Sequence, residues 1–155
     1  MILREYRPAD ADALAEVYRD AVLVLGPHAY TEDQIRVWAM HPEDTEEFRH
    51  SLSAGVTLCA LVDDEPVAFG QLNPVNHLAY LYCASNHARR GFASRILRKL
   101  EAHARAEGVA TLELEASCVA RPFFEHHGYR VVEDERVIRH GVEFLRFKMR
   151  KDFSG

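Results

Sequence analysis

The chain has 155 residues, 48% of them hydrophobic and 28% charged, a length and composition typical of one globular domain. They argue against a second folded domain, a disordered chain and a collagen-like repeat, and we expect residues 1–155 to form a single domain. The net charge of −5 argues against a general nucleic-acid binder, and no apolar run approaches the roughly 20 residues of a membrane helix.

Targeting and metal signals are absent from the sequence. The segment Met1–Arg7 lacks the long apolar stretch of a secretory signal, so we expect a cytoplasmic protein. The cysteines are odd in number and far apart, with no C-x-x-C pair: they are Cys59, Cys83 and Cys118. This pattern supports neither a disulfide framework nor a zinc ribbon, and we predict no metal site.

Charge is distributed unevenly along the chain. Between Asn86 and Lys99 there are five cations and no acid: Arg89, Arg90, Arg95, Arg98 and Lys99. With these five set aside from the net charge of −5, the rest of the chain carries about −10. An acidic chain that keeps one concentrated basic patch indicates a specific anionic ligand or partner.

The chain begins with a strand and a long helix. Ile2–Tyr6 is a short run of β-formers, which predicts the strand. Apolar residues then recur at intervals of three and four from Leu14 to Leu25, the period of an amphipathic helix, and Gly26-Pro27 should end it.

A capping box predicts the start of the second helix. The Thr31 hydroxyl can accept from the N–H of Gln34, and the Gln34 side chain can reach back to the Thr31 N–H. A helix should therefore run from about Glu32 to Met40. Thr45–Leu52 should form a third, short helix.

Strands dominate after Gly55. Three short segments rich in β-formers, separated by turn residues, predict an antiparallel meander. They are Thr57–Val62, Val67–Leu72 and His77–Cys83. A long helix from about Gly91 to Glu107 then leads to a strand, Thr111–Ala116. Because this helix connects the His77–Cys83 strand to the Thr111–Ala116 strand, the three elements are a candidate crossover inside an otherwise antiparallel sheet.

The last part of the chain should contain one more helix and two strands. A short helix covers about Val119–His127, with Pro122 tolerated in its first turn. Tyr129–Glu133 and Val137–Met149 are expected as strands, the second interrupted near His140-Gly141. The alternation of helices and strands predicts the α/β class.

The segment between the His77–Cys83 strand and the long helix has the outline of an anion site. The first N–H groups of a helix have no internal partners and lie at the positive end of its dipole, so they suit a phosphate. Gly91 and Ala93 would let a diphosphate approach the backbone, and Arg89 and Arg90 could add charge-assisted contacts. The segment is neither Walker A nor G-x-G-x-x-G, and a glycine turn beside a solvated helix face would also explain it.

Two stretches resemble signatures of the GNAT superfamily of N-acetyltransferases. The first, Ala88-Arg89-Arg90-Gly91-Phe92-Ala93, resembles the acetyl-CoA motif Gln/Arg-x-x-Gly-x-Gly/Ala and matches two of its three defining positions. The second, Ala120-x-x-Phe123-Phe124-x-x-x-Gly128-Tyr129, resembles Ala-x-x-Phe-Tyr-x-x-x-Gly-Phe. The order of elements is also the family's, so the likeness covers nearly the whole chain, and it is greatest to small bacterial members of unassigned substrate.

The resemblance implies a GNAT fold, a mixed and mostly antiparallel sheet flanked by helices, in which the central parallel strands splay apart. It also implies that acetyl-CoA binds in the splay, with its pantetheine along a strand edge and its diphosphate at the helix N-terminus. The residues expected to hold it are Leu81, Tyr82, Cys83, Arg89, Arg90, Gly91, Phe92, Ala93, Ser94 and Phe123. The basic patch would then neutralise the phosphates.

Acetyl transfer to an amine calls for a base, and two candidates lie on the splayed strands. His77 occupies the position where some family members carry a catalytic Glu, and an imidazole suits proton acceptance near neutral pH; the alternative is a solvated histidine at a strand end. Glu115 points off the face opposite Leu112 and Leu114, where a carboxylate needs water or a polar cleft; the alternative is an ion pair with an arginine.

Three positions depart from the family pattern: Ala88 in the loop motif, Val119 in place of an Asn that contacts pantetheine, and Phe124 in place of the general-acid Tyr. A coenzyme A thiol is acidic enough to leave without an acid, so either another group donates or none is needed. Tyr30 and Trp38 resemble positions on the substrate-side helices of the small members, and we expect them to bind the acceptor; helical aromatics are also common in cores.

We therefore predict an acetyltransferase that moves an acetyl group from acetyl-CoA to a primary amine of a small molecule or peptide, by direct attack in a ternary complex. The alternative is a catalytically degenerate acyl-CoA-binding sensor or interaction module. No nucleic-acid or membrane partner is expected. A homodimer is left open, because Phe144, Leu145 and Phe147 could serve an interface or the core. The acidic remainder of the chain hints at a cationic acceptor.

Overall fold

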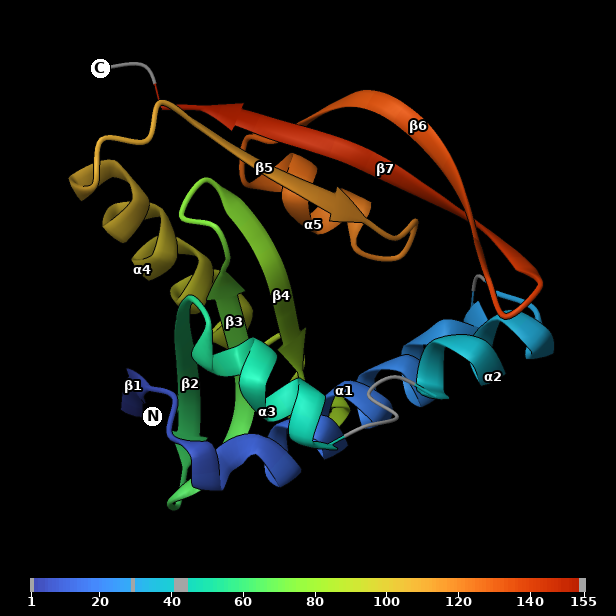
Figure 1. Ribbon diagram of the computed structural model, residues 1–155, viewed down its shortest axis with the longest axis horizontal. Coiled ribbons are helices and arrows are strands. Elements are labelled where there is room, and N and C mark those ends of the chain that lie inside the picture. Colours follow the sequence, from blue (N-terminus) through green and yellow to red (C-terminus); the bar gives the residue numbers. More distant parts are fainter. Residues whose placement is uncertain (1, 29, 41–44, 154–155) are drawn as a thin grey trace.

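The computed structural model describes residues 2–28, 30–40 and 45–153, which form one mixed seven-stranded sheet with helices on both faces (Figure 1). The strand order is β1-β2-β3-β4-β5-β7-β6. The β4–β5 pair is parallel, and the other pairs are antiparallel. The α/β class and the mixed, mostly antiparallel sheet predicted from the sequence are confirmed.

The elements follow the predicted order. The strands are β1 (Ile2–Glu5), β2 (Val56–Val62), β3 (Glu65–Leu72), β4 (His77–Cys83), β5 (Thr111–Ala116), β6 (Arg130–Arg139) and β7 (Val142–Asp152). The helices are α1 (Ala11–Leu25), α2 (Glu32–Met40), α3 (Thr45–Ser53), α4 (Phe92–Ala106) and α5 (Arg121–His126). A short 3-10 turn, Ser85–His87, lies between β4 and α4.

The capping box at the start of α2 is confirmed. The Thr31 N–H donates to Gln34 Oε1 at 2.9 Å, and the Gln34 N–H donates to Thr31 Oγ1 at 3.1 Å. These reciprocal bonds satisfy two N–H groups that the first turn leaves without helical partners, which is why the helix begins at the predicted residue.

The C-terminal hairpin corrects the sequence prediction. Val137–Met149 is not one interrupted strand, because the chain turns back at His140-Gly141 and β6 extends without a break to Arg139. The two turn residues have φ values of 49° and 75°, as a tight two-residue hairpin turn requires. Glu133–Arg136, which looks like a polar connection in the sequence, is the middle of a ten-residue strand.

Apolar side chains form a core on each face of the sheet. On one face α4 and α5 cover the sheet through residues such as Ile96, Leu100 and Phe124. On the other, α1 and α3 cover it through residues such as Leu14 and Phe48, with α2 at its margin. The sheet therefore has helices on both sides, and apolar side chains fill the space between the sheet and each layer of helices.

The central parallel strands separate after a short paired stretch. β4 and β5 pair only at His77 with Glu113 and at Leu78 with Leu114, although both strands continue beyond these residues. In the β3–β4 pairing, Gln71 faces Tyr80 but Leu72 faces Leu78, so Ala79 is an extra, bulged residue. The bulge lies where the splay begins, and the rest of β4 has an open edge toward β5.

Candidate active site

The helix α4 begins at an open loop. Gly91, the residue before it, has a φ of +84°, which favours glycine, and a Cβ built there would meet no atom within 4 Å. The Arg95 N–H bonds back to the Gly91 carbonyl at 3.0 Å. The N–H groups of Phe92, Ala93 and Ser94 therefore precede this bond and have no carbonyl within the helix to pair with.

The cations of this loop and of the first turns of α4 have no carboxylate partners. Within the described ranges, none of the five forms an ion pair: Arg89, Arg90, Arg95, Arg98 and Lys99. Arg89 and Arg90 are both exposed. Their charge is available to an anion at the start of α4.

A carboxylate from α1 holds the beginning of the loop. The Ser85 N–H donates to Asp20 Oδ2 at 2.6 Å, and the Ser85 hydroxyl donates to Asp20 Oδ1 at 3.1 Å. Ser85 opens the turn that leads from β4 into the basic loop, so Asp20 fixes where the loop leaves the strand. Sequence reasoning missed Asp20, because the contact joins residues 65 positions apart and no local pattern indicates it.

Two cavities meet at the splayed ends of β4 and β5. The first, of about 500 Å³, is lined by nine of the ten predicted cofactor residues: Leu81, Tyr82, Cys83, Arg89, Gly91, Phe92, Ala93, Ser94 and Phe123. Arg90 is not in its lining. The second, of about 580 Å³, lies between β4 and β5 on one side and α2 and the β6–β7 hairpin on the other. Both are lined by Trp38, Ala79, Tyr80, Tyr82, Glu115, Ala116 and Ser117, so they are two parts of one cleft.

The backbone of β4 faces the first cavity at two residues. The Ala84 N–H donates to the Val67 carbonyl at 2.8 Å, toward β3. Alternate residues of a strand direct their backbone groups to the same side. The N–H and C=O groups of Leu81 and Cys83 therefore point to the opposite side, where β5 has diverged.

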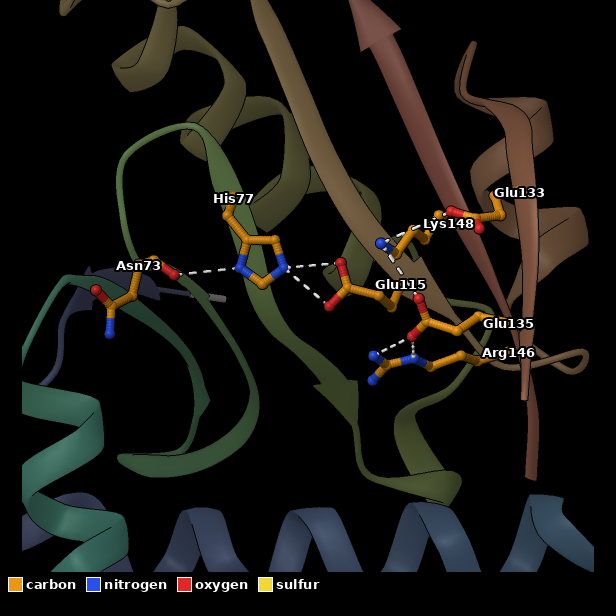
Figure 2. A network of polar contacts seen from close by, with 7 residues as sticks. All are labelled: Asn73, His77, Glu115, Glu133, Glu135, Arg146 and Lys148. Carbon is orange, nitrogen blue, oxygen red and sulfur yellow. Dashed lines mark hydrogen bonds and ion pairs between the residues drawn. The ribbon is translucent and has the colours of Figure 1, made fainter. Parts of the chain in front are cut away.

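His77 and Glu115, the two candidate bases, contact each other (Figure 2). His77 Nε2 lies 3.0 Å from Glu115 Oε2, and His77 Nδ1 lies 3.1 Å from the Asn73 carbonyl oxygen. Both neighbours are acceptors, so both are satisfied only when both ring nitrogens carry a proton. The hydrogen bond to Glu115 raises the pKa of His77 against the effect of burial, and the same bond lowers the pKa of Glu115. The two residues form a hydrogen-bonded pair, and both shifts favour its charged form, an imidazolium beside a carboxylate.

Only one member of this pair reaches the cleft. Glu115 lines both cavities, whereas His77 lines neither. A protonated imidazole with both nitrogens engaged has no lone pair with which to accept a proton. Of the two candidate bases, Glu115 is therefore the one whose side chain lines the cleft, and His77 contacts its carboxylate from outside the lining.

Charged pairs continue from Glu115 onto the hairpin (Figure 2). Arg146 and Lys148 of β7 both pair with Glu135 of β6, and Lys148 also lies 3.8 Å from Glu133. Lys148 is directly opposite Glu115 in the β5–β7 pairing. The cations beside Glu115 are therefore already engaged by carboxylates of β6.

The start of α2 closes the second cavity. The Cys118 N–H, just after β5, donates to the Tyr30 hydroxyl oxygen at 3.1 Å, and the Tyr30 ring meets Trp38 edge-on with 5.2 Å between centroids. Gln34 Nε2 donates to the Glu143 carbonyl of β7 at 2.9 Å. Figure 1 shows the hairpin tip beside α2. Both predicted acceptor residues line this cavity, and Trp38 also lines the first.

Phe124 stands where the family carries its general-acid tyrosine, and its side chain has no proton to donate. Phe124 is buried, and its ring packs against Tyr129, whose hydroxyl donates to Glu101 at 2.6 Å. Burial raises the pKa of Cys83 to about 11. Burial likewise raises the pKa of Tyr30 to about 12, so both groups keep their protons at neutral pH.

A family model described as an acetyltransferase (GNAT) domain matches residues 27–151. The chain belongs to the GNAT acetyltransferase family. It is 30% identical over 149 residues to the uncharacterized N-acetyltransferase YafP of Escherichia coli (strain K12), covering 96% of this chain and 93% of that protein. A GCN5-related N-acetyltransferase from Rhodopseudomonas palustris has a similar crystal structure, with a TM-score of 0.95 and 30% identity over 98% of this chain and 95% of that one.

The fold also extends to more distant members of the family. The PaiA N-acetyltransferase of Thermoplasma acidophilum, solved in complex with coenzyme A, has a TM-score of 0.79 and 19% identity, with 98% of each chain covered. In the part of the GNAT chain that the structure describes, no helix has the length and apolar character to cross a membrane. The same residues contain no group of three or more His, Cys, Asp and Glu side chains arranged to hold a metal ion.

Proposed function

We propose that the chain transfers an acetyl group from acetyl-CoA to a primary amine of a small molecule or peptide, by direct attack of the amine in a ternary complex. The first cavity carries this proposal, because it joins the open edge of β4 to the N-terminus of α4, beside cations without carboxylate partners. A strand edge can pair with the amides of pantetheine, and a helix N-terminus suits a diphosphate. The similar PaiA structure contains coenzyme A, which supports this choice of ligand.

The residues of the first cavity fit coenzyme A. The space in front of Gly91 would be filled by any Cβ, so the glycine leaves room for a group that approaches the backbone. The N–H groups of Phe92, Ala93 and Ser94 would bind the diphosphate, and Arg89 and Arg90 would offset its charge. When bound, acetyl-CoA supplies an activated acetyl group as its thioester.

The backbone of β4 and the side chain of Glu115 would act on the reacting groups. The Cys83 N–H, at the open edge, is the candidate donor to the oxyanion that forms on the acetyl carbonyl. Glu115 would bind the incoming ammonium and receive its proton through water, which is worth roughly 10²–10⁴-fold in rate. Alignment of the two reactants across the shared walls of the cleft would supply more, about 7–11 kcal/mol.

The Tyr30 hydroxyl is the group we infer to assist the leaving thiolate, where Phe124 cannot. It accepts from the Cys118 N–H and interacts with the side chains of Cys118 and Ser117, and Ser117 lines both cavities. Tyr30→Phe should lower kcat about tenfold and leave acetyl-CoA affinity unchanged. An unchanged kcat would show that the thiolate leaves unaided.

A thiol-release assay with acetyl-CoA and a panel of amines tests the proposed function. Sustained release of coenzyme A that depends on one class of amine, together with the acetylated amine in mass spectrometry, is the expected result. Tight binding of acetyl-CoA in calorimetry without turnover on any amine would instead indicate a binding module that has lost catalysis.

A further inference from the structure

The second cavity has aromatic walls. Five partly exposed aromatic side chains line it, from α2, β4, β7 and the segment just before α2: Tyr30, Trp38, Tyr80, Tyr82 and Phe144. Aromatic surfaces of this extent favour an apolar or planar body over a heavily hydroxylated one. The charged groups that line the cavity are Glu47, Glu115, Arg139 and Arg146.

The strand register orders the groups along one face of the hairpin. Residues directly opposite each other share a face, and every second residue returns to it. Moving outward from Glu115 and Lys148, the rows are Arg146 with Glu135, then Phe144 with Val137, then Val142 with Arg139. The face therefore passes from mutually paired charges, through an apolar row, to a cation at the hairpin tip.

Arg139 differs from the other arginines of this face. Its guanidinium makes one contact in the described part of the chain, a 3.4 Å bond from Nη1 to the Ile138 carbonyl, and it has no carboxylate partner there. Arg146, by contrast, is engaged by Glu135. Arg139 is exposed and lines the second cavity, so its charge is available to a molecule bound there.

The charges of the cavity do not suit a polycation. Its carboxylates are Glu47 and Glu115, and Glu115 is already paired with His77. They stand against the guanidinium groups of Arg139 and Arg146, of which Arg146 is paired with Glu135, and against the imidazole of His140. The cavity is therefore not acidic, although the chain as a whole carries a negative net charge.

We propose that the acceptor is an elongated primary amine with an apolar or aromatic body and one anionic group at the end remote from the amine, which Arg139 binds. This inference rests on the proposed function, since it takes the second cavity as the acceptor site. Six residues of β7 separate the row of Glu115 from the row of Arg139, a span of roughly 20 Å. An amine near Glu115 and an anion near Arg139 are thus too far apart for a free α-amino acid and suit a short peptide or a molecule of similar length.

Matched peptides test this assignment. The probes are peptides of five or six residues, roughly 16–22 Å long when extended, with a free N-terminus, a central aromatic residue and either a C-terminal carboxylate or its amide. A third probe carries a terminal phosphate in place of the carboxylate, and a fourth is a linear triamine. Dissociation constants are measured by calorimetry with the coenzyme A-saturated protein, and KM values by thiol release.

The anionic peptides should bind at least about fivefold more tightly than the amide, and the tighter of the two identifies the anion as carboxylate or phosphate. Arg139→Gln should abolish this preference and leave affinity for the amide unchanged. Arg136→Gln is the matched control, because it removes the same charge from the same strand but from the opposite face, where Arg136 pairs with Glu143; it should keep the preference.

Equal binding of the carboxylate and amide peptides, including failure of both to bind, would overturn the proposal, as would tighter binding of the triamine. A preference that survives Arg139→Gln would also overturn it. The calorimetric comparison does not depend on turnover. A charge preference without acetylation of any amine would therefore support this binding site and refute the enzymatic function.

Discussion

Among the residues that the structure describes, Arg89, Arg90 and Arg95, in the loop before α4 and its first turns, have no carboxylate partner. On the β6–β7 hairpin, by contrast, Arg136, Arg146 and Lys148 each pair with a glutamate. A cation that is already paired gains less from a further anion, because its charge is largely offset. The hairpin cations therefore hold two strands together, and those of the loop can hold a ligand. Arg139 belongs to the hairpin but resembles the loop in this respect.

Reversal of charge at the loop should give the largest effect. Arg89→Glu combined with Gly91→Glu should weaken acetyl-CoA binding at least about a hundredfold in calorimetry, because it removes a charge-assisted contact and fills the open space at the helix start with an anion. Arg98→Glu with Lys99→Glu reverses charge further along α4 and should change affinity less than about threefold. Equal losses from both variants would show that only the overall field of the helix matters.

Removal of the carboxylate in the cleft should affect the rate rather than the affinity. Glu115→Gln should lower kcat about a hundredfold and leave the dissociation constant of acetyl-CoA within about twofold. Glu113→Gln is the control, because Glu113 lies on the same face of β5 and pairs with Arg150. If Glu115→Gln retains full kcat across the pH range, Glu115 neither accepts nor positions the proton.

Loss of the contact between Asp20 and Ser85 should weaken the binding of acetyl-CoA by the loop before α4. Asp20→Ala removes the acceptor of both Ser85 bonds, so the loop loses its fixed origin, and KM for acetyl-CoA should rise about five- to tenfold with kcat little changed. Asp12→Ala, an exposed position on the same helix, should change neither parameter. A fall in kcat at constant KM would contradict a role in positioning the cofactor loop.

The His77–Glu115 pair should give the smallest effect, on stability and its pH dependence. Because the pKa of His77 is raised in the folded protein, its contribution to the free energy of unfolding is fully present below about pH 6.5. This contribution is lost as the pH rises through the folded-state pKa. Because the pKa of Glu115 is lowered in the folded protein, its contribution to the free energy of unfolding is lost as the pH falls through the folded-state pKa of Glu115. The difference in unfolding free energy between the wild type and His77→Gln should therefore peak near pH 5–6 at about 1 kcal/mol.

Denaturant titrations of both proteins between pH 4 and pH 9 measure this difference. It should shrink toward pH 9, where His77 loses its proton. A difference that grows with pH would mean that His77 is neutral in the folded protein, and would return it to consideration as the base.

Local patterns were sufficient to predict most of the fold. The capping box of Thr31 and Gln34 predicted where α2 starts, and β4 and β5 also match the predicted ranges. The hairpin was predicted wrongly because Glu133–Arg136 lacks apolar alternation. Its charges are stabilised by partners across the pair, on β7, and a single-strand pattern cannot show such partners.

The sequence predicts individual residues of the site but not the contacts between them. The sequence pattern indicates the basic loop, His77 and Glu115, but not that the last two bind each other 38 positions apart. Nor does it indicate Asp20 or Arg139, whose significance depends on which carboxylates the fold places near them. Whether a charge is already paired is a property of the tertiary structure.

A crystal structure of the chain with acetyl-CoA tests the central claim most directly. We predict the diphosphate within hydrogen-bond distance of the N–H groups of Phe92, Ala93 and Ser94, with the pantetheine along the open edge of β4 at Leu81 and Cys83. Acetyl-CoA bound against the β6–β7 hairpin, or with its diphosphate away from the start of α4, would contradict the account.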